Sequence, residues 1–75
     1  MTIDEFVKSF AGEFDETPTD LFNPQTEYKT LDEWNSLTAL SIISMVDEEL
    51  GKTITGADLR SHKTIQDLFN YISAL

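Results

Sequence analysis

A single serine, Ser36, stands out among the residues that could carry chemistry, because it lies at the expected start of the longest helix of the chain. It follows Trp34 and Asn35 and precedes Leu37. In most proteins a serine at such a place is only a helix N-cap, whose hydroxyl satisfies a backbone donor of the first turn. The same place suits an attached anion, because a helix N-terminus has free backbone donors and a partial positive charge. Position alone leaves a structural and a functional role open for Ser36.

The other side chains with catalytic or metal-binding chemistry lack the partners that such chemistry needs. His62 is the one histidine, and the sequence ties no nucleophile to it, so we expect an exposed loop residue rather than a general base. The acidic run 47–49 lacks the alternating oxygen ligands and the central glycine of a calcium loop. The absence of cysteine excludes a disulfide framework and a thiolate metal site. The sequence therefore predicts neither a catalytic centre nor a metal site.

Four segments have apolar residues at the three- and four-residue spacing of an amphipathic helix. The first has a clear start, because Thr2 and Glu5 form the pattern of a capping box. The longest is followed by Gly51, a residue suited to the left-handed turn that ends a helix. Gly56 weakens the third segment, which should therefore be short. The expected helices span residues 2–14, 36–50, 55–60 and 64–74.

A long connection, residues 15–35, precedes the helix that begins at Ser36. Loops of this length are uncommon in small domains, so part of it should be ordered. Helical turns are expected at residues 17–20 and 30–33, anchored by Leu21, Phe22, Leu31 and Trp34, with Tyr28 as a further anchor. The fold expected for residues 1–75 is one all-α domain, an antiparallel four-helix bundle with three main helices, a short third helix and a long first loop.

The helix expected at 36–50 has more apolar surface than one core contact requires. Its core stripe should consist of Ala39, Ile42, Ile43, Val46 and Leu50. Leu37, Leu40 and Met45 lie off this stripe. An apolar patch on the surface of a small protein commonly marks a contact with another molecule. We therefore expect this helix to present a binding surface.

The chain is strongly acidic, with 14 acidic and 5 basic side chains among its 75 residues and a net charge of −9. Such a charge repels nucleic acid and anionic lipid head groups, so partners should be proteins with basic or apolar patches. No apolar run approaches the roughly 20 residues of a membrane span, and the N-terminus has no signal-peptide pattern. We expect a monomer that works in the cytoplasm.

The residues around Ser36 follow a pattern known from other proteins. It runs Glu33-Trp34-Asn35-Ser36-Leu37 and continues with Leu40, Ile43, Val46, Glu48, Glu49, Leu50, Gly51, Ile54, Asp58, Leu59, Thr64, Ile65 and Leu68. This pattern resembles the acyl and peptidyl carrier protein family over essentially the whole chain. The resemblance extends to the long first loop, the short third helix and the acidic balance.

The resemblance implies a function for Ser36. In this family the serine hydroxyl accepts 4'-phosphopantetheine from coenzyme A, delivered by a separate phosphopantetheinyl transferase. The thiol of this arm then holds acyl intermediates as thioesters, which would explain thiol chemistry in a chain without cysteine. The resemblance also implies a core that opens to shelter the acyl chain. Trp34 is expected as a core or loop anchor, and contact with the base of the arm is the alternative for it. The lining that we expect for the opened core is Phe6, Ile43, Val46, Ile54 and Ile72.

Two features depart from the family pattern. Asn35 stands where the family usually has an aspartate that helps the transferase bind magnesium, and an amide is a poor substitute for a carboxylate at this cation, so a dedicated or tolerant transferase is expected. The second and third helices carry fewer acids than the family's docking surface, so docking should be less sensitive to salt. The residues expected to meet the transferase, an acyl-loading enzyme and the synthases or acyltransferases are Asn35, Leu37, Leu40, Ser41, Met45, Asp47 and Glu48.

Several functions remain open at this point. We expect a carrier that is not itself an enzyme and that serves fatty-acid biosynthesis or a specialised, polyketide-like pathway. A carrier of aminoacyl groups is an alternative within the family. An unmodified acidic helical module, which binds a partner groove through Leu37 and Leu40, is an alternative from another class. Attachment of the arm to Ser36 would separate the carriers from the module.

Overall fold

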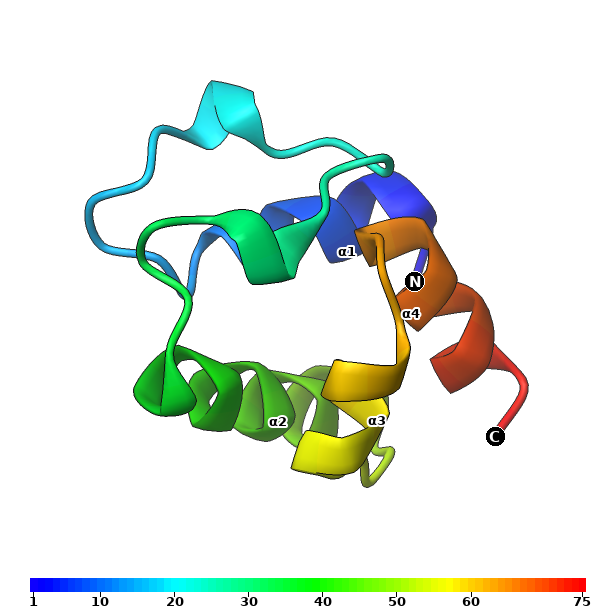
Figure 1. Ribbon diagram of the computed structural model, residues 1–75. Helices are drawn as coiled ribbons and strands as arrows, with labels where there is room; N and C mark the ends of the chain where they lie inside the picture. The colour runs from blue at the N-terminus through cyan, green and yellow to red at the C-terminus, as the bar shows by residue number, and fades with distance from the viewer.

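The computed structural model describes all residues from 1 to 75 and contains helices but no strands (Figure 1). The α-helices are α1 (Ile3–Ala11), α2 (Ser36–Leu50), α3 (Gly56–Ser61) and α4 (Ile65–Ser73). Two 3₁₀ turns, η1 (Thr19–Leu21) and η2 (Tyr28–Thr30), lie in the connection between α1 and α2. The all-α bundle with three main helices, a short third helix and a long first loop is thus confirmed. No helix reaches the length and apolar character needed to cross a membrane.

Most helix ends follow from local sequence signals. Thr2, Thr55 and Thr64 each accept a backbone hydrogen bond at the start of α1, α3 and α4, and each is part of a capping box. Gly51 ends α2 with a φ of 65°, a conformation that costs residues with a side chain about 1 kcal/mol or more. The predicted bounds of α2 are therefore confirmed.

The predicted C-terminal end of α1 was wrong by three residues. The helix ends at Ala11, and Gly12 caps it, instead of the helix continuing to Phe14. The backbone N–H of Phe14 donates to the carbonyl of Ala11, so a tight turn folds the chain back onto the bundle. Phe14 is therefore buried at 7% exposure although it lies outside the helix.

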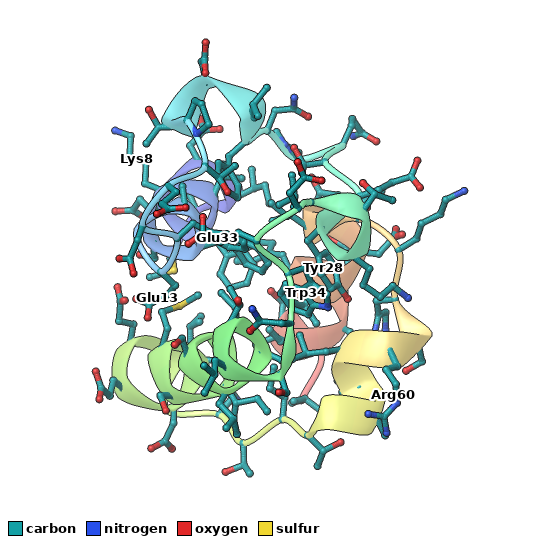
Figure 2. All side chains as sticks on the ribbon, turned by 60° about the vertical axis from the view of Figure 1, so that its left-hand side comes forward. Lys8, Glu13, Tyr28, Glu33, Trp34 and Arg60 are labelled. Atoms are coloured by element: carbon teal, nitrogen blue, oxygen red, sulfur yellow. The ribbon has the colours of Figure 1, made fainter.

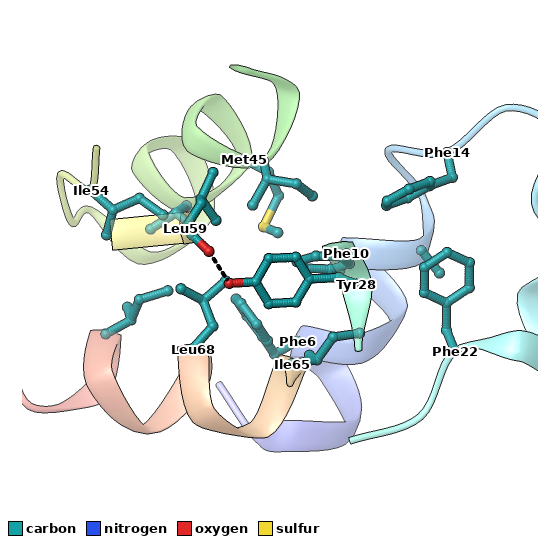
Figure 3. Close-up of a cluster of buried hydrophobic side chains, with 14 residues drawn as sticks. Phe6, Phe10, Phe14, Phe22, Tyr28, Met45, Ile54, Leu59, Ile65 and Leu68 are labelled. Carbon is teal, nitrogen blue, oxygen red and sulfur yellow. Dashed lines mark hydrogen bonds between the residues drawn. The ribbon is translucent and has the colours of Figure 1, made fainter. Parts of the chain in front are cut away.

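The core lies between one pair of helices, α1 and α4, and a second pair, α2 and α3. The α1 helix packs against α4 and α2, and α3 packs against α2. Figure 3 shows aromatic rings from α1 and from the long connection meeting aliphatic side chains of the other helices. Tyr28 is completely buried, and its hydroxyl donates to the carbonyl of Leu59 at 2.5 Å. This bond ties the long connection to α3, and burial raises the pKa of the Tyr28 phenol well above its ordinary value.

The two turns in the connection were expected at slightly different residues. The first begins at Thr19, and Pro18 precedes it without any side-chain cap. Phe22 anchors it in the core as predicted, whereas Leu21 is 53% exposed and anchors nothing. The second turn lies at Tyr28–Thr30 rather than at 30–33, because Tyr28 itself is the buried anchor. Leu31 and Trp34 follow it as half-buried residues packed against the core, as expected.

Candidate functional site

The first residue of α2 is Ser36, and its side chain is exposed to solvent. Its hydroxyl makes no hydrogen bond to any other group of the protein, so it is not the N-cap of its helix. That role belongs to Asn35, whose Oδ1 accepts the backbone N–H groups of Leu37 at 2.9 Å and of Thr38 at 3.1 Å. The Ser36 hydroxyl is therefore left free for a reaction with another molecule.

The Asn35 cap changes one expectation about the helix N-terminus. The sequence suggested that free backbone donors would be available to an anion on Ser36, but Asn35 already occupies two of those donors. The partial positive charge of the helix end remains, because it arises from the aligned peptide dipoles of all 15 residues of α2. An anion on Ser36 would thus be favoured by the helix dipole more than by direct hydrogen bonds.

A second set of hydrogen bonds fixes the backbone just before Ser36. The Glu33 carboxylate accepts the backbone N–H groups of Asp15 at 2.7 Å, Glu16 at 3.0 Å and Thr17 at 2.9 Å, and also the Thr17 hydroxyl at 2.7 Å. These bonds hold the pKa of the Glu33 carboxyl below its ordinary value, with the Thr17 hydroxyl as the largest cause. Sequence reasoning missed this role of Glu33, because its partners lie 16 to 18 residues away along the chain.

The Glu33 backbone is held from the other side as well. The Thr38 hydroxyl donates to the Glu33 carbonyl at 2.6 Å, which closes the first turn of α2 onto the loop that precedes it. This bond explains why Thr38 is the one polar residue buried in the protein, at 8% exposure. The loop before Ser36 is therefore held at Glu33 through both the side chain and the backbone of that residue.

Trp34 fixes the same loop by aromatic packing (Figure 2). Its ring lies 5.0 Å from the ring of Tyr28 in an edge-on arrangement, and it stacks on Phe10 and Phe14 at 6.5 Å and 6.4 Å between centroids. Such aromatic pairs stabilise a fold by about 1 kcal/mol each beyond simple burial. Trp34 is thus the loop anchor that the sequence predicted.

A hollow of about 430 Å³ opens beside Ser36, between α2, α3 and the η2 turn. Its walls are mainly apolar, and its lining residues are Lys29, Trp34, Ser36, Ala39, Leu40, Ile43, Gly56, Leu59 and Arg60. Trp34 therefore lies on the wall next to Ser36, where a group attached to the serine would begin. Of the five residues expected to line the opened core around an acyl chain, Ile43 borders this hollow. The other four residues, Phe6, Val46, Ile54 and Ile72, are buried in the closed core.

The apolar surface of α2 is smaller than the sequence suggested. Leu37 and Leu40 are 73% and 59% exposed, as expected for a docking surface. Met45 was wrongly expected there, because it is only 3% exposed and belongs to the core. Helix geometry gives the reason, since residues 38, 42, 45 and 46 share one face and Thr38 can be buried on it through its hydrogen bond to Glu33.

The polar residues expected at the docking surface lie along the same helix. Asn35, Asp47 and Glu48 are exposed, and Ser41 is half-buried with its hydroxyl donating to the Leu37 carbonyl. Near the end of α2, burial and the adjacent Glu49 and Glu48 carboxylates raise the pKa of Glu13. The acidic residues of α2 itself therefore lie at its C-terminal end, beside Glu13.

His62 is not the exposed loop residue that the sequence suggested. It is half-buried at the end of α3, with Nδ1 2.7 Å from the Asp58 carbonyl and its ring 4.7 Å from that of Tyr71. Because a carbonyl only accepts, Nδ1 must carry the proton in this hydrogen bond. The ring closes the C-terminal end of α3, which gives His62 a structural role.

The surroundings of Ser36 suit a group that is attached through its oxygen, because an exposed, unbonded hydroxyl borders an apolar hollow. Residues 5–72 match the family model described as the phosphopantetheine attachment site. No curated protein and no solved structure matches the chain. Since the matched residues make up most of the chain, it belongs to the phosphopantetheine attachment site family, whose members are carrier domains with a covalently attached 4'-phosphopantetheine.

Proposed function

We propose that this carrier domain is an acyl carrier protein that bears its 4'-phosphopantetheine arm on Ser36. One observation carries the proposal: the Ser36 hydroxyl is exposed and unbonded at the first residue of α2, at the edge of an apolar hollow. The other serines of α2 are less suited. The Ser41 hydroxyl is engaged with the Leu37 carbonyl, and Ser44 lies in the middle of the helix, away from its positive end.

Attachment of the arm requires one bond to form and one to break. The Ser36 oxygen bonds to the phosphorus that carries pantetheine in coenzyme A, the pyrophosphate linkage breaks, and the adenosine bisphosphate half leaves. The hydroxyl proton passes to a base of the transferase, because no protein group of this chain accepts a hydrogen bond from Ser36. When bound, the arm supplies the terminal thiol that holds the cargo as a thioester.

The chain's own residues favour an acyl cargo over an aminoacyl cargo. Five of the residues that line the hollow, Trp34, Ala39, Leu40, Ile43 and Leu59, have apolar side chains, so that a hydrocarbon chain would leave water there. Each buried methylene contributes about 0.8 kcal/mol. We therefore favour fatty-acid or polyketide-like biosynthesis as the setting. A longer chain would have to open the core toward Val46 and Ile54.

The enzymes that load and use the carrier are proposed to dock on the start of α2. Leu37 and Leu40 supply the exposed apolar contact, and Asn35 lies beside Ser36 where the transferase must approach. Asp47 and Glu48 would meet basic residues of a partner farther along the helix. The partners are thus a phosphopantetheinyl transferase, an acyl-loading enzyme, and a synthase or acyltransferase.

Intact mass tests the proposal directly. The apo protein is incubated with coenzyme A, magnesium and a broad-specificity transferase, and we expect one phosphopantetheine to be added. Ser36→Ala should gain no mass and should fold as well as the wild type, because Ser36 is exposed and unbonded. Ser44→Ala removes another exposed hydroxyl of α2 and should still accept one arm. If the wild type gained no mass with any transferase, the unmodified interaction module would become the better explanation.

A further inference from the structure

Two of the five basic side chains, Lys29 and Arg60, line the hollow beside Ser36. They come from different elements, since Lys29 lies in the η2 turn and Arg60 in α3. In a protein with a net charge of −9, a hollow that has two cations and no carboxylate among its lining residues is a local reversal of charge. In so acidic a chain, two cations that have no carboxylate beside them in the same hollow call for a physical explanation.

The local contacts leave both charges available. The Lys29 ammonium donates to the Arg60 carbonyl at 2.6 Å, an uncharged acceptor near the C-terminal end of α3. The Arg60 guanidinium folds back along α3 toward Gly56, and a Cβ at that glycine would be 3.3 Å from one of its nitrogens. Figure 2 shows the Arg60 side chain projecting from α3 toward solvent.

The one carboxylate of α3 is directed elsewhere. Asp58 accepts the backbone N–H of Thr55 with one oxygen and the hydroxyl of Tyr71 with the other. These bonds hold the pKa of Asp58 below its ordinary value, with the Thr55 backbone bond as the largest cause. Asp58 is thus committed to the capping box and to α4, and it does not neutralise Arg60.

We propose that Lys29 and Arg60 form an anion-binding edge of the hollow, which holds an oxyanion carried by the arm on Ser36. The proposal rests on the proposed function, because the arm brings the anion to the hollow. The oxyanion has two possible sources, the phosphodiester next to Ser36 and a carboxylate on the acyl cargo. Guanidinium and ammonium groups recognise both through charge-assisted hydrogen bonds.

The two sources predict different cargo preferences. If the phosphodiester is the anion, the two cations orient the base of the arm and treat every cargo alike. If a cargo carboxylate is the anion, the apolar walls hold the acyl carbons while Lys29 and Arg60 offset the cost of bringing a charge into the hollow. The carrier would then favour acyl groups that end in a carboxylate over hydrocarbon chains of the same length.

The test compares three loaded forms of the protein by nuclear magnetic resonance. The transferase attaches unacylated phosphopantetheine, butyryl-phosphopantetheine or succinyl-phosphopantetheine, and intact mass establishes each loading. Butyryl and succinyl have the same number of carbons, and only succinyl ends in a free carboxylate once it is bound as a thioester. The readouts are the Arg60 Nε and Gly56 amide resonances, the phosphorus resonance, and the pKa of the labelled succinyl carboxylate. The variants are Lys29→Gln and Arg60→Gln, with Lys63→Gln as the control, since Lys63 is exposed and does not line the hollow.

Binding of a cargo carboxylate predicts a shift of the Arg60 Nε resonance in the succinyl form only. The Gly56 amide, which lines the hollow, should shift more in the succinyl form than in the butyryl form. Binding of a cargo carboxylate also predicts that the succinyl pKa lies about 0.5 lower in the wild type than in either glutamine variant at low salt. Binding of the phosphodiester predicts equal shifts of the Arg60 Nε resonance in all three forms. It also predicts a phosphorus resonance that changes in Lys29→Gln and in Arg60→Gln. Lys63→Gln should change none of these readouts.

The proposal is overturned if loading leaves the Arg60 Nε resonance at its position in the unmodified protein, or if Lys63→Gln has the same effect as the two variants. That result would leave the proposed function intact, because mass would still show the arm in place. A protein that never gains the arm would overturn the proposed function itself, and with it this anion-binding edge.

Discussion

At the scale of single residues, the reactivity of Ser36 depends on its neighbour. Serine and asparagine are both strong N-caps, so either could have satisfied the first turn of α2. The sequence alone could not decide between them, because both choices fit the start of the same apolar pattern. The backbone at Asn35 is extended while Ser36 is already helical, so Asn35 caps the helix and the serine hydroxyl makes no hydrogen bond.

Substitutions at Asn35 should separate its capping role from its role toward the transferase. Asn35→Ala removes the cap and should lower the free energy of unfolding by about 1 kcal/mol, measured by chemical denaturation. Asn35→Asp keeps an acceptor for the same two N–H groups and adds a carboxylate that can bind magnesium. We expect Asn35→Asp to retain stability and to speed attachment of the arm at limiting magnesium.

Ser44→Asp is the matched control for this experiment, since it adds the same charge to an exposed position of α2. It should leave the rate of attachment close to that of the wild type. Equal rates for Asn35→Asp and the wild type across a magnesium series would show that the amide at position 35 does not limit the transferase.

At the scale of elements, the loop before α2 is held by contacts from distant parts of the chain. Glu33 joins it to residues 15–17, and Tyr28 joins the same connection to α3. The carboxylate of Glu33 stabilises the fold only while it is ionised, because an ionised oxygen is the better acceptor for four donors. Its lowered pKa means that this stabilisation is present above the ordinary value of 4.5 and is lost as the pH falls through the folded value.

Acidification of a Glu33→Gln variant tests this role. The variant should melt below the wild type at about pH 7, and the gap between their melting temperatures should narrow by about pH 3, where the wild-type carboxylate has gained its proton. Glu27→Gln removes a charge from an exposed position in the same loop and should melt with the wild type at both pH values. If the melting temperatures of Glu33→Gln and the wild type differed equally at both pH values, Glu33 would act through packing and not through its charge.

The elements that the sequence predicted well are those with local signals. The bounds of α2 follow from its apolar spacing, its capping position and Gly51, and the capping boxes mark the starts of α1, α3 and α4. The end of α1 was missed, because Phe14 fits the apolar spacing while burying its ring from a turn. Met45 was missed because the buried face of α2 includes Thr38, whose burial depends on a partner in the preceding loop. Contacts of this kind cannot be read from helix periodicity.

At the scale of the whole molecule, the two ends of α2 present different surfaces to a partner. The acidic side chains of α2 lie at its C-terminal end, whereas Leu37 and Leu40 are exposed near Ser36. Dissolved salt screens exposed charges over a Debye length of about 10 Å or less, so the attraction between such charges weakens as salt is added. Apolar contacts persist in salt. Docking near Ser36 should therefore rely on the two leucines more than on charge.

A salt series with the transferase tests this expectation. Between about 0.05 and 0.5 M NaCl, the KM for the wild-type protein should rise by less than about tenfold. Leu37→Ala should raise the KM at every salt concentration without lowering stability, because its side chain is 73% exposed. Met45→Ala should instead cost about 2–5 kcal/mol of stability, because it leaves a cavity in the core. A steep rise of KM with salt in the wild type would assign docking to the acidic residues.

The most direct test of the account locates the arm within the chain. Trypsin cleaves after Lys29 and Lys52, so the peptide of residues 30–52 contains Ser36, Ser41 and Ser44 together. Fragmentation of this peptide from the modified protein should place the whole added mass on Ser36 and leave the other two serines unmodified. An added mass on Ser41 or Ser44, or outside this peptide, would contradict the account.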